Sequence, residues 1–239
     1  MIIDAHVHVK GGDQYLRYFN AEEIVRCMDE AGIDKSVVFA ISVTSAEANA
    51  MTLREVAKFP DRLIGFAYAL PAFDRLVIDD LERAITSDGM RGIKMHSGVA
   101  RLHDYLAGPV LELAGRLGVP VLADVAGDMG IAKDLVENHK GTNIIFAHLG
   151  GLGLSETGID WFIELARTHD HVYLDTSYVP KAWKIADAIA KAGAEKVIWG
   201  SDGPLIHPRL ELEKVKILGL PADAEAKVLG GNIARLIGA

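Results

Sequence analysis

Two histidines separated by one residue, His6 and His8, lie in the first apolar segment of the chain. In a β-strand, residues two apart project from the same face, so both imidazoles would point to one side of a sheet. Two imidazoles on one strand can supply two nitrogen ligands to a single metal ion. Histidines that are simply hydrogen-bonded on a strand are the alternative. The pair therefore indicates a metal site only if other ligands converge on it.

Further titratable side chains lie where other apolar segments end, namely His96, Asp124, His148, Asp175 and Asp202. Asp202 stands in a Gly-Ser-Asp-Gly-Pro turn, where its carboxylate could bind a metal and accept a proton from a bound water, or could cap a helix. His148 is a candidate general acid or base, or else a core histidine bonded to a loop. Asp175 could orient a ligand histidine or could simply end its strand.

The segments that carry these residues alternate regularly with helical segments, one of which is expected from about Asp74 to Thr86. The strands are expected at residues 2–9, 36–41, 63–69, 92–96, 119–124, 143–148, 172–175 and 196–200. Such alternation implies an α/β fold with parallel strands and right-handed crossovers. The strand count and the 239-residue length favour a single (β/α)8 TIM barrel, formed by residues 1–239 as one domain, over a doubly wound sheet.

In such a barrel the carboxyl ends of the strands form the active site. On the first strand we expect Asp4, His6 and His8 to face the barrel axis. Ala5 and Val7 are then expected to face outward, against the helices.

The same alternation predicts the orientation of residues on two other strands. Lys94 is expected to share the inward face with His96 and to form a buried ion pair with Asp4, because an isolated buried charge is unfavourable. His148 is expected on the inward face together with Phe146.

The loop after the fourth strand carries Arg101 and His103, which could bind a substrate carboxylate together with His96 or could be surface residues without a role. Tyr178 and Trp183, after the seventh strand, could wall a pocket or serve in packing.

Composition restricts the class of partner. The chain has 25 Lys and Arg against 33 Asp and Glu residues, a formal net charge of −8, and a pI near 5.6. This balance argues against binding to nucleic acid or to an anionic membrane. The lone cysteine, Cys27, fits a reducing compartment, and no apolar run reaches the roughly 18 residues of a membrane span. We expect a cytoplasmic protein with a small-molecule substrate. Whether the chain forms a homo-oligomer does not follow from the sequence.

Five segments together resemble the amidohydrolase superfamily, in its amidohydrolase-2 branch related to aminocarboxymuconate semialdehyde decarboxylase. They are IDAHVH (3–8), GIKMH (92–96), NIIFAHLGG (143–151), YLDTS (173–177) and GSDGP (200–204), in the family's order. The resemblance implies a (β/α)8 barrel with a mononuclear, usually zinc, site. It also implies that His6, His8 and Asp202 are metal ligands and that His148 assists catalysis.

One position departs from the family pattern. The family usually ends its fifth strand with a metal-binding histidine, whereas this chain has Asp124 there. An aspartate can still ligate, and the more anionic ligand set would suit zinc, manganese or iron. The alternative is that the metal has been lost, because the family includes metal-independent lactonases. A carbamylated Lys94 that bridges two metals is a less favoured alternative.

These observations predict an enzyme with one divalent metal ion, zinc with manganese or iron as alternatives, unless the metal is absent. The favoured reaction is hydrolysis of a small carboxylated amide, ester or lactone by a metal-activated water. Non-oxidative decarboxylation of an aromatic or unsaturated acid and metal-independent lactone hydrolysis are the alternatives. A ligand-binding barrel without turnover is the least favoured. The short loops favour hydrolysis, because decarboxylating members of the branch are generally longer.

Overall fold

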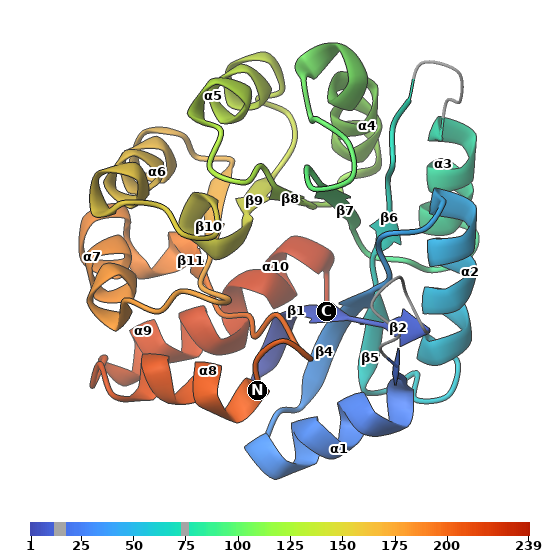
Figure 1. Ribbon diagram of the computed structural model, residues 1–239. Helices are drawn as coiled ribbons and strands as arrows, with labels where there is room; N and C mark the ends of the chain where they lie inside the picture. The colour runs from blue at the N-terminus through green and yellow to red at the C-terminus, as the bar shows by residue number, and fades with distance from the viewer. Residues whose placement is uncertain (12–17, 73–76) are drawn as a thin grey trace.

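Parallel strands form a barrel in the computed structural model, and the helices surround it (Figure 1). The structure describes residues 1–11, 18–72 and 77–239. The barrel strands, in order around the sheet, are β1 (Ile3–His8), β4 (Lys35–Phe39), β5 (Leu63–Gly65) with β6 (Ala67–Tyr68), β7 (Ile93–His96), β8 (Val121–Asp124), β9 (Ile144–Phe146), β10 (Val172–Asp175) and β11 (Val197–Ile198). A short antiparallel pair, β2 (Lys10–Gly11) and β3 (Tyr18–Phe19), follows β1.

The barrel closes at two places where the regular strand pairing is interrupted. β5 and β6 are one extended segment that is broken at Phe66, and they pair with β4 and β7 respectively. Between the last strand and the first, the Asp202 N–H donates to the His6 carbonyl, and the His8 N–H donates to the Gly203 carbonyl, both at 2.8 Å. With β5 and β6 counted as one strand, eight strands surround the axis, as predicted.

The helices begin largely at residues that the sequence marks as caps. The side chains of Asn20, Thr44, Asp128 and Ser155 each accept a hydrogen bond from a backbone N–H in the first turn. The helices are α1 (Ala21–Ala31), α2 (Ser45–Val56), α3 (Ile78–Thr86), α4 (Asp104–Leu117), α5 (Met129–Asn138), α6 (Glu156–Thr168), α7 (Ala182–Ala192), α8 (Pro208–Lys216), α9 (Ala222–Ala226) and α10 (Asn232–Ile237). The predicted start of the third helix, Asp74, lies outside the described residues. Within those residues, every helix is too short or too polar to cross a membrane.

Buried apolar side chains form two clusters, one on each side of the barrel wall. The larger cluster lies between strands and helices and includes Val38, Met95 and Val121. The smaller cluster fills the barrel interior with Ile3, Ala5, Phe39, Leu122, Ile145, Tyr173 and Ile198, and Ile233 and Ile237 of α10 pack against it. Figure 1 shows α10 beside β1 and β11. The polar side chains at the carboxyl ends of the strands therefore stand on an apolar floor.

A register shift in β1 changes which of its residues face the axis. Asp4 pairs with Ser36 and Val7 with Val38, so β1 has one more residue between these pairs than β4 has. Such a bulge reverses the alternation of side chains along the strand.

Three expectations for this region are wrong because of the bulge. Ala5 belongs to the interior cluster, and Asp4 points outside the barrel, where its Oδ1 accepts a hydrogen bond from the Ser201 N–H at 2.9 Å. Lys94 does not pair with Asp4, because its Nζ lies inside the barrel, 3.3 Å from His6 Nε2. His6 and His8 nevertheless meet in the interior, since their rings lie 5.2 Å apart, centroid to centroid.

Candidate active site

The ring of His6 is held by a carboxylate from β10. His6 Nδ1 lies 2.5 Å from Asp175 Oδ2, and both side chains are buried. Burial, together with the nearby Lys94 ammonium, lowers the pKa of His6 well below its usual value, so the ring is neutral. Because Nδ1 faces a carboxylate, the hydrogen-bond pattern assigns the ring proton to Nδ1, and the lone pair of Nε2 faces the Lys94 Nζ at 3.3 Å. This is the orientation in which a carboxylate prepares a histidine to ligate a metal.

Asp202 meets both histidines of β1. Its Oδ1 lies 2.9 Å from His8 Nε2 and 3.5 Å from His6 Nε2. Burial opposes the charged carboxylate, but the hydrogen bond from His8 and the adjacent imidazoles hold the pKa of Asp202 well below its usual range. Asp202 has a left-handed backbone, with φ 60°, which is unfavourable outside glycine and frequent at functional sites. The carboxylate is therefore ionised and held beside two imidazole nitrogens.

His148 approaches the same space from the end of β9. Its Nδ1 donates to the Ser177 carbonyl at 2.8 Å, and its Nε2 lies 3.6 Å from Asp124 Oδ2. Burial disfavours the charged imidazole, but the nearby Asp124 and the other carboxylates raise the pKa of His148 above its usual value. These carboxylates therefore stabilise the protonated ring.

The path by which His148 reaches the interior differs from the predicted one. Phe146, expected to share its inward face, packs outward against Phe162 of α6, with ring centroids 5.4 Å apart. His148 and Leu149 adopt left-handed backbone angles, with φ 59° and 51°. This turn, rather than strand alternation, aims the imidazole into the barrel.

Asp124 faces histidines from two neighbouring strands. Its Oδ2 lies 3.3 Å from His96 Nε2, and its Oδ1 accepts a hydrogen bond from the Ala126 N–H at 2.8 Å. Burial raises the pKa of Asp124, but His148 and the Lys94 ammonium outweigh burial and hold it well below its usual range. Burial and the Lys94 ammonium also lower the pKa of His96 to about 4. Asp124 is thus an ionised partner of His96 and His148, and its predicted role as a metal ligand stays a prediction.

Lys94 is completely buried at the centre of these groups. Its Nζ lies 3.3 Å from His6 Nε2 and 5.0 Å from the centroid of the Phe39 ring. Burial lowers the pKa of this ammonium, whereas the charges of Asp124, Asp175 and Asp202 act in the opposite direction. Lys94 therefore offsets part of the negative charge of the three carboxylates.

The side chains present fit one divalent cation. His6, His148 and Asp202 each offer a ligand atom, and these atoms all lie within 4.8 Å of one another. His8 joins them through its contact with Asp202. Imidazole nitrogens with a carboxylate oxygen are a donor set typical of zinc, and also of manganese and iron sites.

Two residues predicted to bind substrate lie in the loop before α4. Arg101 is exposed, and the ring of His103 stacks on Tyr105 with centroids 5.4 Å apart. Their role in substrate binding stays a prediction.

Ser177 is a buried site residue that the sequence analysis did not single out. Its Oγ lies 3.1 Å from His6 Nδ1 and 3.0 Å from His148 Nδ1, and it donates to Asp175 Oδ2 at 2.9 Å. The Asp-x-Ser spacing was the available signal, because Asp side chains often accept from the backbone N–H two residues on, as here at 2.6 Å.

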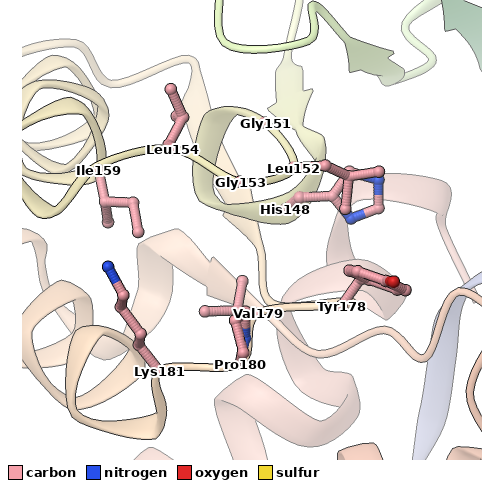
Figure 2. Close-up of a pocket in the computed structure, with 10 residues that line it drawn as sticks. All are labelled: His148, Gly151, Leu152, Gly153, Leu154, Ile159, Tyr178, Val179, Pro180 and Lys181. Atoms are coloured by element: carbon pink, nitrogen blue, oxygen red, sulfur yellow. The ribbon is translucent and has the colours of Figure 1, made fainter.

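A pocket of about 160 Å³ adjoins His148 (Figure 2). Its lining comes from the turns after β9 and β10 and from the start of α6. Tyr178 lines it, which is one of the two roles that the sequence left open for this residue, whereas Trp183 is not among the lining residues.

Comparisons with known proteins agree with this fold. The family model described as Amidohydrolase matches residues 3–239, and no curated protein matches the chain. A probable 2-pyrone-4,6-dicarboxylic acid hydrolase of Acinetobacter baumannii is 17% identical with a TM-score of 0.79, covering 100% of this chain and 99% of that one.

Two decarboxylases share the fold as well. The 5-carboxyvanillate decarboxylase of Sphingomonas paucimobilis is 16% identical with a TM-score of 0.75, covering 99% of this chain and 98% of that one. A manganese-bound dihydroxybenzoic acid decarboxylase of a Polaromonas species is 17% identical with a TM-score of 0.74, covering 99% and 96%. At these identities the likeness establishes the TIM barrel alone. The family match over nearly the whole chain goes further, and the chain belongs to the amidohydrolase family, as an enzyme of its amidohydrolase-2 branch.

Proposed function

We propose that the protein is a metal-dependent hydrolase of a small amide, ester or lactone. The observation that carries the proposal is the hydrogen bond from His6 Nδ1 to Asp175, which leaves His6 Nε2 as the unprotonated ring nitrogen beside the ionised carboxylate of Asp202. His6, His8 and Asp202 would hold the ion, and His148, which also lies close enough to ligate it, is assigned instead to proton transfer. When bound, a divalent ion supplies Lewis acidity and lowers the pKa of a water molecule. Zinc is the proposed ion, with manganese and iron as alternatives.

Two residues of the chain would move protons in this reaction. Asp202 is ionised and would accept a proton from the water that attacks the carbonyl carbon. His148, whose pKa is raised by the carboxylates around it, would give a proton to the departing oxygen or nitrogen as the acyl bond breaks. The products are a carboxylic acid and an alcohol or amine, or a hydroxy acid from a lactone.

Two groups hold His148 for this role. The Ser177 carbonyl accepts from its Nδ1, so Nε2 is the nitrogen that exchanges the proton. Asp124 stabilises the imidazolium from 3.6 Å. Between turnovers Asp202 would release the proton that it took from water, and His148 would take up one proton, so that both return to their starting states.

The test is a parallel assay of the purified protein with and without a metal chelator. A panel of lactones, aryl esters and amides is followed for hydrolysis, and a panel of aromatic and unsaturated acids is followed for release of carbon dioxide. We expect hydrolysis that is lost with the chelator and restored by zinc or manganese. His148→Asn should lower kcat by about 10²- to 10⁴-fold, whereas His169→Asn, outside the site, should leave it unchanged.

Two results would overturn the proposal. Carbon dioxide release without hydrolysis would assign the chain to the decarboxylases. Hydrolysis that persists after complete metal removal would assign it to metal-independent lactonases.

A further inference from the structure

We propose that the pocket beside His148 is a subsite for an uncharged, apolar group of the substrate, about the size of one six-membered ring. The inference rests on the proposed function, because it names the substrate class of the same site.

The position of the pocket links it to the chemistry. Residues 151–154 follow β9 and residues 178–181 follow β10, and Figure 2 shows these two turns facing each other with His148 between them. Loops at the carboxyl ends of barrel strands carry the substrate contacts of TIM-barrel enzymes. A group bound in the pocket would therefore lie directly beside the imidazole that protonates the departing atom.

The size of the pocket limits its occupant. Its volume is about 160 Å³. An apolar protein cavity of about 150 Å³ accommodates benzene. One ring, or a branched aliphatic group of similar size, therefore fills this space.

The pocket wall is mainly apolar, formed by Leu152, Leu154, Ile159, Val179 and Pro180. An aromatic wall is added by Tyr178, whose ring is edge-on to that of His148 with centroids 6.3 Å apart. Tyr178 keeps this place in a left-handed backbone conformation, with φ 56°, that is unfavourable for tyrosine. Such strain is retained where the surrounding structure demands the conformation.

The charge in the wall is already balanced. The pocket lining contains two basic residues, His148 and Lys181. The Nζ of Lys181 lies 3.8 Å from Glu156 Oε1. In Figure 2 its side chain rises beside Ile159, on the side of the pocket away from His148. His148 likewise faces Asp124, at 3.6 Å. A carboxylate on the substrate would thus lose its hydration and meet cations that already face carboxylates, which disfavours anionic groups here.

Binding of benzyl alcohol tests the proposal, with benzoate and methanol as comparison probes in an NMR titration. We expect wild-type protein to bind benzyl alcohol more tightly than either. Val179→Phe should fill the pocket and weaken the binding of benzyl alcohol at least tenfold. Leu152→Ala, at an exposed side chain that is not needed for folding, should weaken it at least threefold. Leu210→Ala, at an exposed residue of α8, is the control and should have no effect.

Equal affinity for benzyl alcohol in wild type, Val179→Phe and Leu152→Ala would overturn the proposal, as would tighter binding of benzoate than of benzyl alcohol. The same titration with His6→Ala separates this inference from the proposed function. Selective binding of benzyl alcohol by His6→Ala, as by wild type, would support the subsite independently of the metal. Wild-type protein that binds the probe selectively but neither binds metal nor hydrolyses any substrate would refute the hydrolase alone. The opposite result is metal-dependent hydrolysis at a rate that does not depend on the size of the substrate's apolar group, both in wild type and in Val179→Phe. That result would refute the subsite alone.

Discussion

At the scale of single residues, the hydrogen bond between His6 Nδ1 and Asp175 Oδ2 determines what the other ring nitrogen can do. The carboxylate keeps the proton on Nδ1 and fixes the ring plane, so that Nε2 is presented to Asp202. Ser177 secures the carboxylate by donating from both its N–H and its hydroxyl. A ligand whose orientation is fixed before the ion arrives loses less entropy when it binds.

Asp175→Asn tests this positioning. The substitution removes the carboxylate charge, so His6 loses its fixed tautomer, and we expect metal affinity to fall by about 10- to 100-fold. Titration against a coloured chelator measures the affinity, and circular dichroism checks the fold. Asp187→Asn, on the outer helix α7, is the matched control. Unchanged affinity in Asp175→Asn would contradict the role given to this carboxylate.

Residue types were better predicted than residue orientations. The sequence analysis named His6, His8, His148 and Asp202, and the structure brings them together because each lies near the carboxyl end of a strand. Strict two-residue alternation failed at Asp4, because the β1 bulge adds a residue that a sequence pattern does not reveal. It failed again before His148, where two left-handed residues redirect the chain.

At the scale of elements, the site depends on how closely the end of β11 approaches β1 and β10. A Cβ at Gly200 would lie 2.9 Å from both Asp175 Oδ1 and His6 Cβ. Glycine is therefore needed where the last strand passes behind the His6–Asp175 pair.

Gly200→Ala should displace that pair. We expect a loss of about 1–3 kcal/mol in the free energy of unfolding, because the added methyl overpacks a buried contact. Metal affinity should fall in the same variant. Urea denaturation measures the first effect and chelator competition the second. Gly141→Ala is the control, since no atom lies within 4 Å of the added methyl. Equal behaviour of the two variants would refute this account of β11.

Helix α8 carries a buried acid beneath the turn that follows β10. Glu211 is 1% exposed, and burial raises its pKa to about 7 although Lys214 Nζ lies 2.5 Å away. The unfolded chain releases this proton near the ordinary value of 4.5, so between the two values the folded state binds more protons. Stability should therefore fall as pH rises from about 4.5 to about 7, by at most about 3 kcal/mol.

Glu211→Gln should reduce this pH dependence, because the amide does not titrate, whereas Asp4, whose pKa burial also raises to about 7, still contributes in the variant. Denaturation of both proteins at a series of pH values makes the comparison. If the wild type and the variant lose stability in parallel between pH 5 and 7, another group is responsible.

Elements were predicted well where a strand or helix has a clear pattern. The order of strands and helices follows from alternating apolar runs and from cap residues such as Asn20 and Ser155. The third strand is divided at Phe66 into β5 and β6, which its continuous apolar run does not reveal. The division depends on pairing with different neighbours, and pairing is a property of the assembled barrel.

At the scale of the whole molecule, the barrel separates stability from function. Its interior floor is apolar and closed by α10, whereas its polar interior groups gather at the carboxyl end. There the carboxylates Asp124, Asp175 and Asp202 face Lys94 and the histidines. A divalent cation would offset the negative charge that remains, which gives a function to part of the acidity that the composition shows.

The most direct test of that central claim is the location of the metal. We expect crystals of protein loaded with zinc or manganese to give one strong anomalous peak in the barrel mouth, about 2.0–2.2 Å from His6 Nε2 and a carboxylate oxygen of Asp202. Bound metal should be lost in His6→Ala and in Asp202→Ala. A peak elsewhere in the barrel, or full metal content in both variants, would contradict the account.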